Sequence, residues 1–167
     1  MITILISVEN QNDLAVTKKL TEMSTSVDGW APDYMGHGHI SGIDEIYSLL
    51  KDEYPDLWEV IKAAIKPVYQ RTREGMVANW KTYSEWSMVE FLHALANDNP
   101  YATIGLLYPE ALLSGQWLTA IIRLIAIMSE RGKKIAVATH RHDVVDLVKE
   151  ITGGANVKVI DMDKKSI

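Results

Sequence analysis

Short apolar runs alternate with helical patterns through the second half of this 167-residue chain, and this alternation restricts the fold more than any other feature. Strands are predicted at Thr103–Tyr108, Lys134–Thr139 and Val157–Asp161, with helices between them at Ser114–Arg131 and Arg141–Ile151. Strands that are joined through helices by short links are typical of a parallel sheet. We therefore expect an α/β fold in which a mostly parallel sheet is flanked by helices.

The first half of the chain adds one more strand and less regular segments. Ile2–Ser7 is apolar and β-branched, which predicts a buried strand, and the spacing within Leu14–Leu20 predicts a helix packed on one side. Ser24–Gly42 is rich in Ser, Asp, Gly and Pro and is predicted to be a loop. A helix is expected at Ile43–Leu50, with Ser41 as its cap.

The middle of the chain is harder to assign. Asp56–Thr72 is predicted to be a helix that is kinked or broken at Pro67, because proline removes a backbone donor and clashes with the preceding turn. Gly75–Tyr83 fits neither a helix nor a strand clearly, whereas Ser84–Ala96 has helical spacing. No repeat or low-complexity linker divides the sequence, so residues 1–167 are expected to form a single domain.

Composition narrows the classes of protein that fit. Hydrophobic residues make up 47% of the chain, enough for one core, and the net charge of −5 argues against a simple nucleic-acid binder. Cysteine is absent, which excludes a disulfide scaffold, a thiolate metal site and a cysteine nucleophile. The N-terminus lacks a signal-peptide pattern, and the longest apolar stretch, Trp117–Met128, is too short to cross a bilayer. We therefore expect a cytoplasmic protein without membrane contact.

Two segments of the second half resemble the C-terminal half of ABC-type ATPase heads, closest to the OLD-like and SMC-like branch. The first is Leu106–Trp117, in which Pro-Glu-Ala at 109–111 follows an apolar strand and precedes a long helix. The second is the strand that ends in Thr139-His140. In this family the first strand ends in the two acidic Walker B residues and the second in a Thr-His or Ser-His switch. The resemblance implies a P-loop-NTPase-like fold of reduced size.

Two earlier segments extend the resemblance towards the N-terminus. Ile2–Leu20 resembles the strand, phosphate loop and helix that open these ATPases. Residues 83–90 resemble the signature motif Leu-Ser-x-Gly-Glu, since Ser87 and Glu90 match while Trp86 and Val89 replace the leucine and the glycine. Heads of this family dimerise with each signature motif facing the partner's phosphate loop. The resemblance therefore places these four residues at an interface.

The segment that resembles a phosphate loop lacks the residues that bind nucleotide in the family. Ser7 and Asn12 stand at the framing glycines with Asn10 between them, Asp13 replaces the lysine, and Leu14 replaces the Ser/Thr. The glycines let successive backbone N–H groups wrap the phosphates, the lysine meets the β- and γ-phosphates, and the hydroxyl holds Mg²⁺. A carboxylate in place of the lysine reverses an interaction worth about 4 kcal/mol at roughly 4 Å near a protein surface.

The segment that resembles Walker B has lost its acidic residues as well. Leu107 and Tyr108 stand where the family has the Mg²⁺-coordinating aspartate and the catalytic glutamate. Phosphoryl transfer depends almost wholly on positioning and charge stabilisation. The resemblance therefore implies a pseudo-ATPase with no catalytic residue and no cofactor, in which His140 keeps the position of the γ-phosphate switch without a nucleotide to sense.

Two histidine pairs leave another class of function open. His37 and His39 form one pair and His140 and His142 the other, and imidazole is the commonest metal-binding side chain. A metal-dependent enzyme would use these pairs with a nearby carboxylate. A His pair in a glycine-rich segment is more often part of an exposed loop, so we expect no bound metal.

Together these features predict a non-catalytic protein-interaction module. The expected partner is a true ABC-type ATPase or a second copy of the chain as a homodimer, with no role for nucleic acid. One form of this role is a viral or mobile-element protein, such as a phage protein that binds or inhibits a host ABC-type ATPase. A nucleotide-binding regulator that does not hydrolyse ATP, and the His-based enzyme above, are the alternatives.

Overall fold

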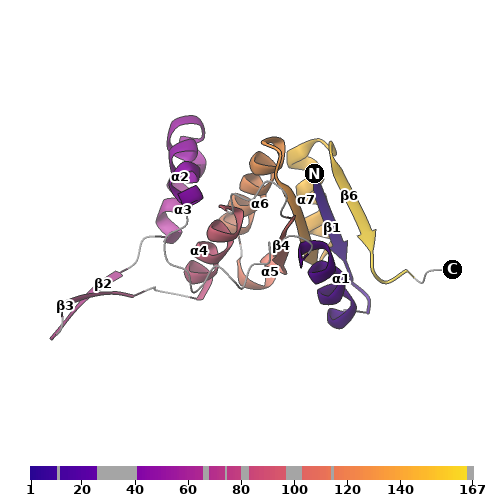
Figure 1. Cartoon of the computed structure of the whole chain (residues 1–167), viewed down its shortest axis with the longest axis horizontal. Coiled ribbons are helices and arrows are strands. Elements are labelled where there is room, and N and C mark those ends of the chain that lie inside the picture. The colour runs from indigo at the N-terminus through magenta and orange to yellow at the C-terminus, as the bar shows by residue number, and fades with distance from the viewer. Residues whose placement is uncertain are drawn as a thin grey trace.

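Four parallel strands form the sheet at the centre of the fold, in the order β4-β5-β1-β6 (Figure 1). The computed structural model describes residues 1–10, 12–25, 41–65, 68–73, 75–79, 83–96, 103–113 and 115–164. In chain order, the elements are β1 (Ile2–Ile6), α1 (Asp13–Thr25), α2 (Ser41–Glu53), α3 (Pro55–Ile65), β2 (Val68–Thr72), β3 (Gly75–Asn79), α4 (Tyr83–Leu95), β4 (Thr103–Leu107), α5 (Pro109–Leu112), α6 (Gly115–Glu130), β5 (Lys134–Thr139), α7 (His142–Thr152) and β6 (Val157–Asp161). The predicted α/β fold with a parallel sheet flanked by helices is confirmed.

The register of the sheet brings the ends of distant segments together. Ile6 of β1 pairs with Thr139 of β5 on one side and with Asp161 of β6 on the other. Leu107 of β4 pairs with Ala138 of β5. Because the strands are all parallel, the residues that follow β1, β4, β5 and β6 emerge along one edge of the sheet.

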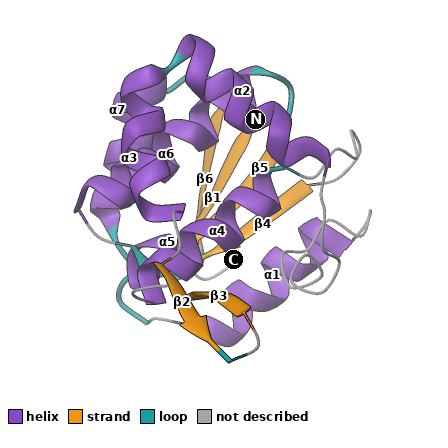
Figure 2. Ribbon diagram, turned by 90° about the vertical axis from the view of Figure 1, so that its left-hand side faces the viewer, coloured by secondary structure: helices purple, strands orange, loops and turns teal. Residues whose placement is uncertain are grey.

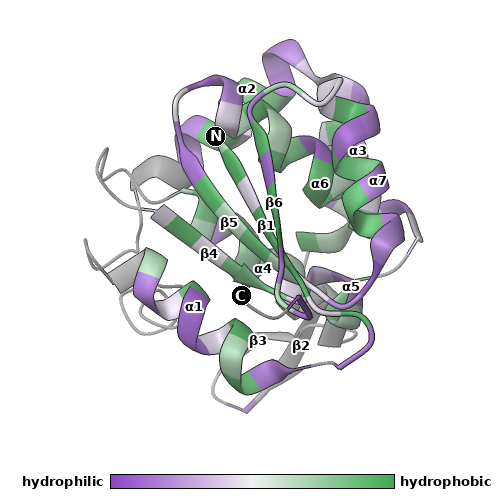
Figure 3. Cartoon of the chain, turned by 90° about the vertical axis from the view of Figure 1, so that its right-hand side faces the viewer, coloured by the Kyte–Doolittle hydropathy of each residue, from purple (hydrophilic) through white to green (hydrophobic). Residues whose placement is uncertain are grey.

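The two faces of the sheet carry cores of unequal size. On β1, Ile4 and Ile6 join the larger core, which α4, α6 and α7 cover, whereas Leu5 joins a smaller core under α1. Figure 2 shows α1 on one side of the sheet and the remaining long helices on the other, and Figure 3 shows that the strands between them are largely apolar. On β5, Ala136 and Ala138 face the smaller core, and their small side chains allow α1 to pack close to the sheet.

Helices α2 and α3 form an outer layer on the side of the larger core. Helix α3 packs against α2, α4 and α6, and it buries Leu57 and Ile61. Two ion pairs join this layer to α6 and the turn that follows it. Arg123 lies 3.1 Å from Asp56, and the side chain of Arg131 lies 2.8 Å from that of Glu53. The layer holds α6 in place from the side opposite the sheet.

The helix predicted at Asp56–Thr72 is confirmed as far as Ile65, but its second half is wrong, because a β-hairpin begins at Val68. Helix α3 ends at Ile65, and β2 pairs with β3 in antiparallel register (Figure 1). The residue before a proline is disfavoured in helical conformation, and Val68 and Tyr69 favour strands. These local preferences end the helix before the helical spacing of apolar residues ends. Residues 66–67, which include the kink or break predicted at Pro67, lie outside the described residues.

Other predicted boundaries are shifted by a few residues. The loop predicted at Ser24–Gly42 is wrong at both ends, because α1 continues to Thr25 and α2 begins at Ser41, and residues 26–40 lie outside the described residues. The segment left open at Gly75–Tyr83 begins as β3. Gly132 follows α6 with a φ of 98°, as expected for a glycine that ends a helix. No helix in the described ranges is both long enough and apolar enough to cross a membrane.

Candidate functional site

The carboxyl edge of the sheet gathers most of the residues that stand at nucleotide-site positions. Ser7 follows β1, Tyr108 follows β4, and His140 follows β5. Asp13 begins α1, where the Asn12 side chain accepts a 3.3 Å hydrogen bond from the backbone N–H of Ala15 and so caps the helix. An acidic residue in the first turn also suits the positive end of the helix dipole. The local sequence thus builds a normal helix start where the family has its glycine and lysine.

Asp13, Tyr108 and His140 form one cluster of contacts, which we call the carboxyl-edge triad. The Tyr108 hydroxyl donates to Asp13 Oδ1 at 2.8 Å, and His140 Nε2 lies 2.8 Å from the same oxygen. The rings of Tyr108 and His140 are stacked, with centroids 4.1 Å apart and planes 20° apart. The residues that the resemblance assigns to the phosphate-binding lysine, the catalytic glutamate and the switch histidine are therefore in contact with one another.

Tyr108 is held in an unusual conformation at this site. Its backbone lies in the left-handed region, with φ 48° and ψ 60°, at the start of the short helix α5. Such a conformation costs a residue other than glycine about 1–3 kcal/mol, so it persists only where the surroundings fix it. Burial, followed by the hydrogen bond to Asp13 and the negative charges of Asp13 and Glu110, raises the pKa of the Tyr108 phenol. The hydroxyl therefore stays protonated and acts as a donor.

His140 is anchored on three sides. Its Nδ1 lies 2.8 Å from the carbonyl oxygen of Ser7, and because a carbonyl can only accept, Nδ1 carries a hydrogen. Glu110 Oε1 accepts 2.8 Å hydrogen bonds from the Thr139 hydroxyl and from the backbone N–H of His140. Glu110 thus acts as a positioning residue that ties α5 to the end of β5, a role that its match to a family motif did not predict.

The segment that resembles a phosphate loop is bound by a carboxylate of the chain itself. Asp163 Oδ1 accepts a 2.7 Å hydrogen bond from the Ser7 hydroxyl, and Asp163 Oδ2 accepts 2.9 Å bonds from the backbone N–H groups of Val8 and Glu9. The Ser7 hydroxyl oxygen in turn accepts a 2.9 Å bond from the N–H of Asn12. The hydrogen bond from Ser7, with help from the backbone, lowers the pKa of the Asp163 carboxyl.

Sequence reasoning missed Asp163. The signal for it was present in the chain, because Asp161 ends a strand predicted to share the sheet with Ile2–Ser7 and Asp163 lies two residues further on. What the sequence could not provide was that β6 would be the direct neighbour of β1. Only that pairing places Asp163 beside Ser7.

Leu14 and Leu107, two more of the predicted nucleotide-site positions, lie outside these bonds. Leu14 is 83% exposed on α1, so it contributes nothing to a core. Asn10 is exposed as well. Leu107 is half-buried and packs against the smaller core beside α1. Leu14 and Leu107, which the resemblance assigns to the two metal-ligand positions, have hydrocarbon side chains that offer no oxygen to Mg²⁺.

The four signature-like residues, at positions 86, 87, 89 and 90, lie within α4, which begins at Tyr83. Ser87 is buried at 1% exposure, and Val89 and Glu90 are half-buried. The side chain of Trp86 lies outside the described residues. Of the motif, Val89 and Glu90 have partly exposed side chains that a partner can touch.

The structure describes only one of the two histidine pairs. His37 and His39 lie outside the described residues. His140 is engaged by Ser7 and by Asp13, and His142 is exposed at the start of α7. Within the described ranges no three His, Cys, Asp or Glu side chains are grouped as a metal site requires.

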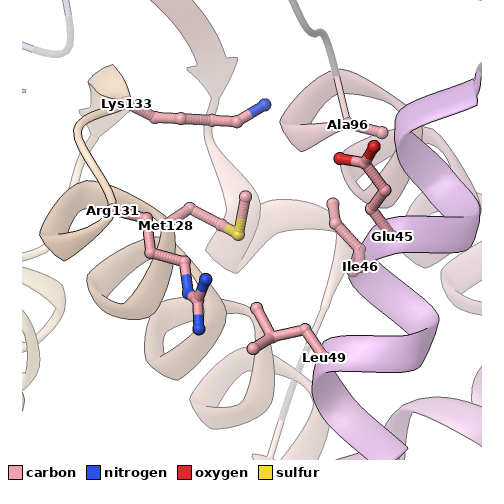
Figure 4. Close-up of a pocket in the computed structure, with 7 residues that line it drawn as sticks. All are labelled: Glu45, Ile46, Leu49, Ala96, Met128, Arg131 and Lys133. Atoms are coloured by element: carbon pink, nitrogen blue, oxygen red, sulfur yellow. The ribbon is translucent and has the colours of Figure 1, made fainter.

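A cavity of about 270 Å³ lies away from the triad, between α2 and the C-terminal end of α6 (Figure 4). Ile46, Leu49 and Met128 give it apolar walls, and Glu45 and Arg131 add charge at its rim. Arg131 and Lys133 precede β5, so this cavity lies at the amino ends of the strands. None of the triad residues lines it.

Comparison with known proteins supports the fold but shows no family. No family model matches the chain, and no curated protein is similar to it in sequence. A solved structure, described as the dimeric structure of a bacterial ABC transporter cassette, aligns over 96% of this chain and 81% of its own with a TM-score of 0.50 and 14% sequence identity. The chain is therefore similar in fold to an ABC ATPase head.

Proposed function

We propose that this chain is a non-catalytic relative of ABC ATPase heads, a pseudo-ATPase that works by binding another protein. The observation that carries the proposal is the carboxyl-edge triad. By resemblance, Asp13, Tyr108 and His140 stand at the positions of three groups that handle nucleotide phosphates in the family. Here Tyr108 and His140 both contact Asp13 Oδ1, and their rings stack on each other. Side chains that satisfy one another need no ligand to complete the site.

The charges at this edge support the same proposal. Three carboxylates, those of Asp13, Glu110 and Asp163, lie at this edge of the sheet and accept the hydrogen bonds described above. Two like charges at roughly 4 Å repel by about 4 kcal/mol at the effective dielectric near a protein surface. A triphosphate placed here would meet this repulsion, and the position that resembles the phosphate-binding lysine holds the carboxylate of Asp13. Phosphoryl transfer needs positive charges in place.

The partner we propose is a true ABC-type ATPase or a second copy of this chain. The cassette of similar fold was solved as a dimer, which gives a precedent for pairing through this fold. On our chain Leu14 is exposed beside Asp13, and the half-buried Val89 and Glu90 lie on α4. We propose that these residues belong to the pairing surface. A phage or other mobile-element protein that inhibits a host ATPase would act in this way.

Two measurements on the full chain test the proposal. Phosphate release from Mg²⁺-ATP should stay at the level of the buffer, and sedimentation velocity should give the same assembly state with and without Mg²⁺-ATP. A turnover above that level which Glu110→Gln abolishes would contradict the non-catalytic function. Assembly that appears only with nucleotide would favour a nucleotide-binding regulator instead. Co-sedimentation with a purified ABC-type ATPase head then separates a hetero-partner from self-association.

A further inference from the structure

The Asp163 carboxylate accepts hydrogen bonds from three groups at the start of the segment that resembles a phosphate loop. Its two oxygens accept from the Ser7 hydroxyl at 2.7 Å and from the Val8 and Glu9 N–H groups at 2.9 Å each. The backbone of Asn10 adds to the stabilisation of the charged carboxylate. Successive backbone N–H groups that converge in this way form a concave site for an anion. The anion that fills it here is part of the same chain.

The position of Asp163 is fixed by the sheet. The N–H of Met162 donates to the carbonyl of Ile6 at 2.7 Å, which continues the pairing of β6 with β1 by one step. The N–H of Asp163 then donates to Asp161 Oδ1 at 3.0 Å, so that the chain turns directly after the strand. These bonds aim the Asp163 carboxylate at residues 7–9 without help from a ligand.

We propose that the Asp163 carboxylate is an internal ligand of the loop at residues 7–9 and prevents an external phosphate from binding there. We call this interaction the latch. The inference rests on the proposed non-catalytic function. It gives a second reason, besides the aspartate at position 13 in place of a lysine, why the loop would not bind phosphate. An intramolecular carboxylate competes with a free anion at a high effective concentration. The loop therefore keeps one conformation whether or not nucleotide is present.

The surroundings of the latch reinforce the closure. A cavity of about 260 Å³ adjoins it, lined by Glu9, Asp161 and Asp163 and by two basic groups, those of His142 and Lys164. The carboxylates disfavour a second anion in this space, and Lys164 offsets only part of the negative charge already present. Removal of the Asp163 charge alone would leave the N–H groups of Val8 and Glu9 free for an external anion.

Titration of the full-length, ¹⁵N-labelled chain with inorganic pyrophosphate at constant ionic strength tests the latch. The readout is the amide shifts of Val8 and Glu9. In Asp163→Ala these amides should respond at a pyrophosphate concentration at least tenfold lower than in the unaltered chain. Asp56→Ala is the matched control, because it removes an equal charge from an exposed ion pair on α3. It should respond as the unaltered chain does.

Each outcome bears on the latch. An equal response of Val8 and Glu9 in Asp163→Ala and in the unaltered chain would overturn it, and so would an equal gain in Asp56→Ala. If Asp163→Ala does not fold, Asp163→Asn decides, because it keeps the shape of the side chain without its charge and should also gain affinity. ATP turnover by the unaltered chain would contradict the proposed function, whereas an unchanged affinity in both Asp163 variants contradicts only the latch.

Discussion

The hydroxyl of Tyr108 and the carboxylate of Asp13 meet in a 2.8 Å hydrogen bond between residues 95 positions apart in the chain. Both residues were expected to weaken nucleotide chemistry, each at its own motif. The structure shows that they are partners, and that His140 reaches the same oxygen of Asp13. The two side chains are therefore coupled, since each supplies the group that satisfies the other.

Tyr108→Phe should lower the free energy of unfolding by about 1 kcal/mol, because it removes a hydrogen bond whose partner is largely exposed to water. Urea unfolding of Tyr108→Phe, Asp13→Ala and the double variant measures this loss. The effects of the two single changes should not add, since either one removes the shared bond. Additive losses would mean that the two side chains do not interact in solution.

Asp13→Lys should not give ATP hydrolysis, although it places a cation at the position that resembles the lysine of a phosphate loop. The side chains of Leu14 and Leu107 still offer no oxygen to a metal ion, and a tyrosine with an ordinary pKa of about 10 stays protonated at neutral pH even without Asp13, so it is no general base. The variant should also be less stable, because a lysine cannot accept the bonds from Tyr108 and His140. Phosphate release measured beside the unaltered chain checks the first expectation, and hydrolysis above the buffer level would show that one cation suffices.

Much of the sheet could be predicted from the sequence because its strands are short, apolar and separated by long amphipathic helices. Lys134–Thr139 and Val157–Asp161 have the predicted bounds. The hairpin at Val68–Asn79 could not be predicted in this way, because the pattern of the preceding helix continues into it. There local β-preference after Pro67 opposes the helical period, and periodicity alone does not show which effect is larger.

The site was predictable residue by residue but not as an arrangement. Resemblance to a family placed Asp13, Tyr108 and His140 at one site, yet hydrogen bonds depend on orientations that spacing does not contain. The left-handed backbone of Tyr108 aims its hydroxyl at Asp13, and no motif indicates that conformation. Asp163 was missed because it lies outside every segment that resembles the family.

Ala138→Leu should disturb the triad through the core. Ala138 is fully buried in the small core under α1, so a larger side chain must push the helix that begins at Asp13. Overpacking of this kind costs about 1–3 kcal/mol. Val137→Leu is the matched control, since Val137 is equally buried but belongs to the larger core on the other face.

Chemical shifts of the His140 ring report on the triad in both variants. They should move in Ala138→Leu and stay close to their original values in Val137→Leu. Similar movement in both would show that the position of α1 does not control the triad.

The contribution of Asp163 to stability should depend on pH. Its pKa is lower in the folded chain than the value near 3.9 of an unfolded aspartate, so the folded state favours the charged form. That contribution is fully present above the unfolded pKa and is lost as the pH falls through the folded pKa. The difference in unfolding free energy between the unaltered chain and Asp163→Asn should therefore be larger at pH 6 than at about pH 3. A difference that stays constant over this range would mean that the carboxylate charge is not stabilised by the loop.

Leu14→Glu should weaken association while it leaves the fold intact. Leu14 is 83% exposed, so its replacement costs little stability, but an apolar side chain beside the triad can be buried against a partner. Val159→Glu is the matched control, because Val159 is also an exposed apolar residue, on β6. Sedimentation velocity of the chain alone and with an ABC-type ATPase head measures both variants. We expect the Kd of the complex to rise at least tenfold in Leu14→Glu alone, and an equal effect of both variants would place the contact elsewhere.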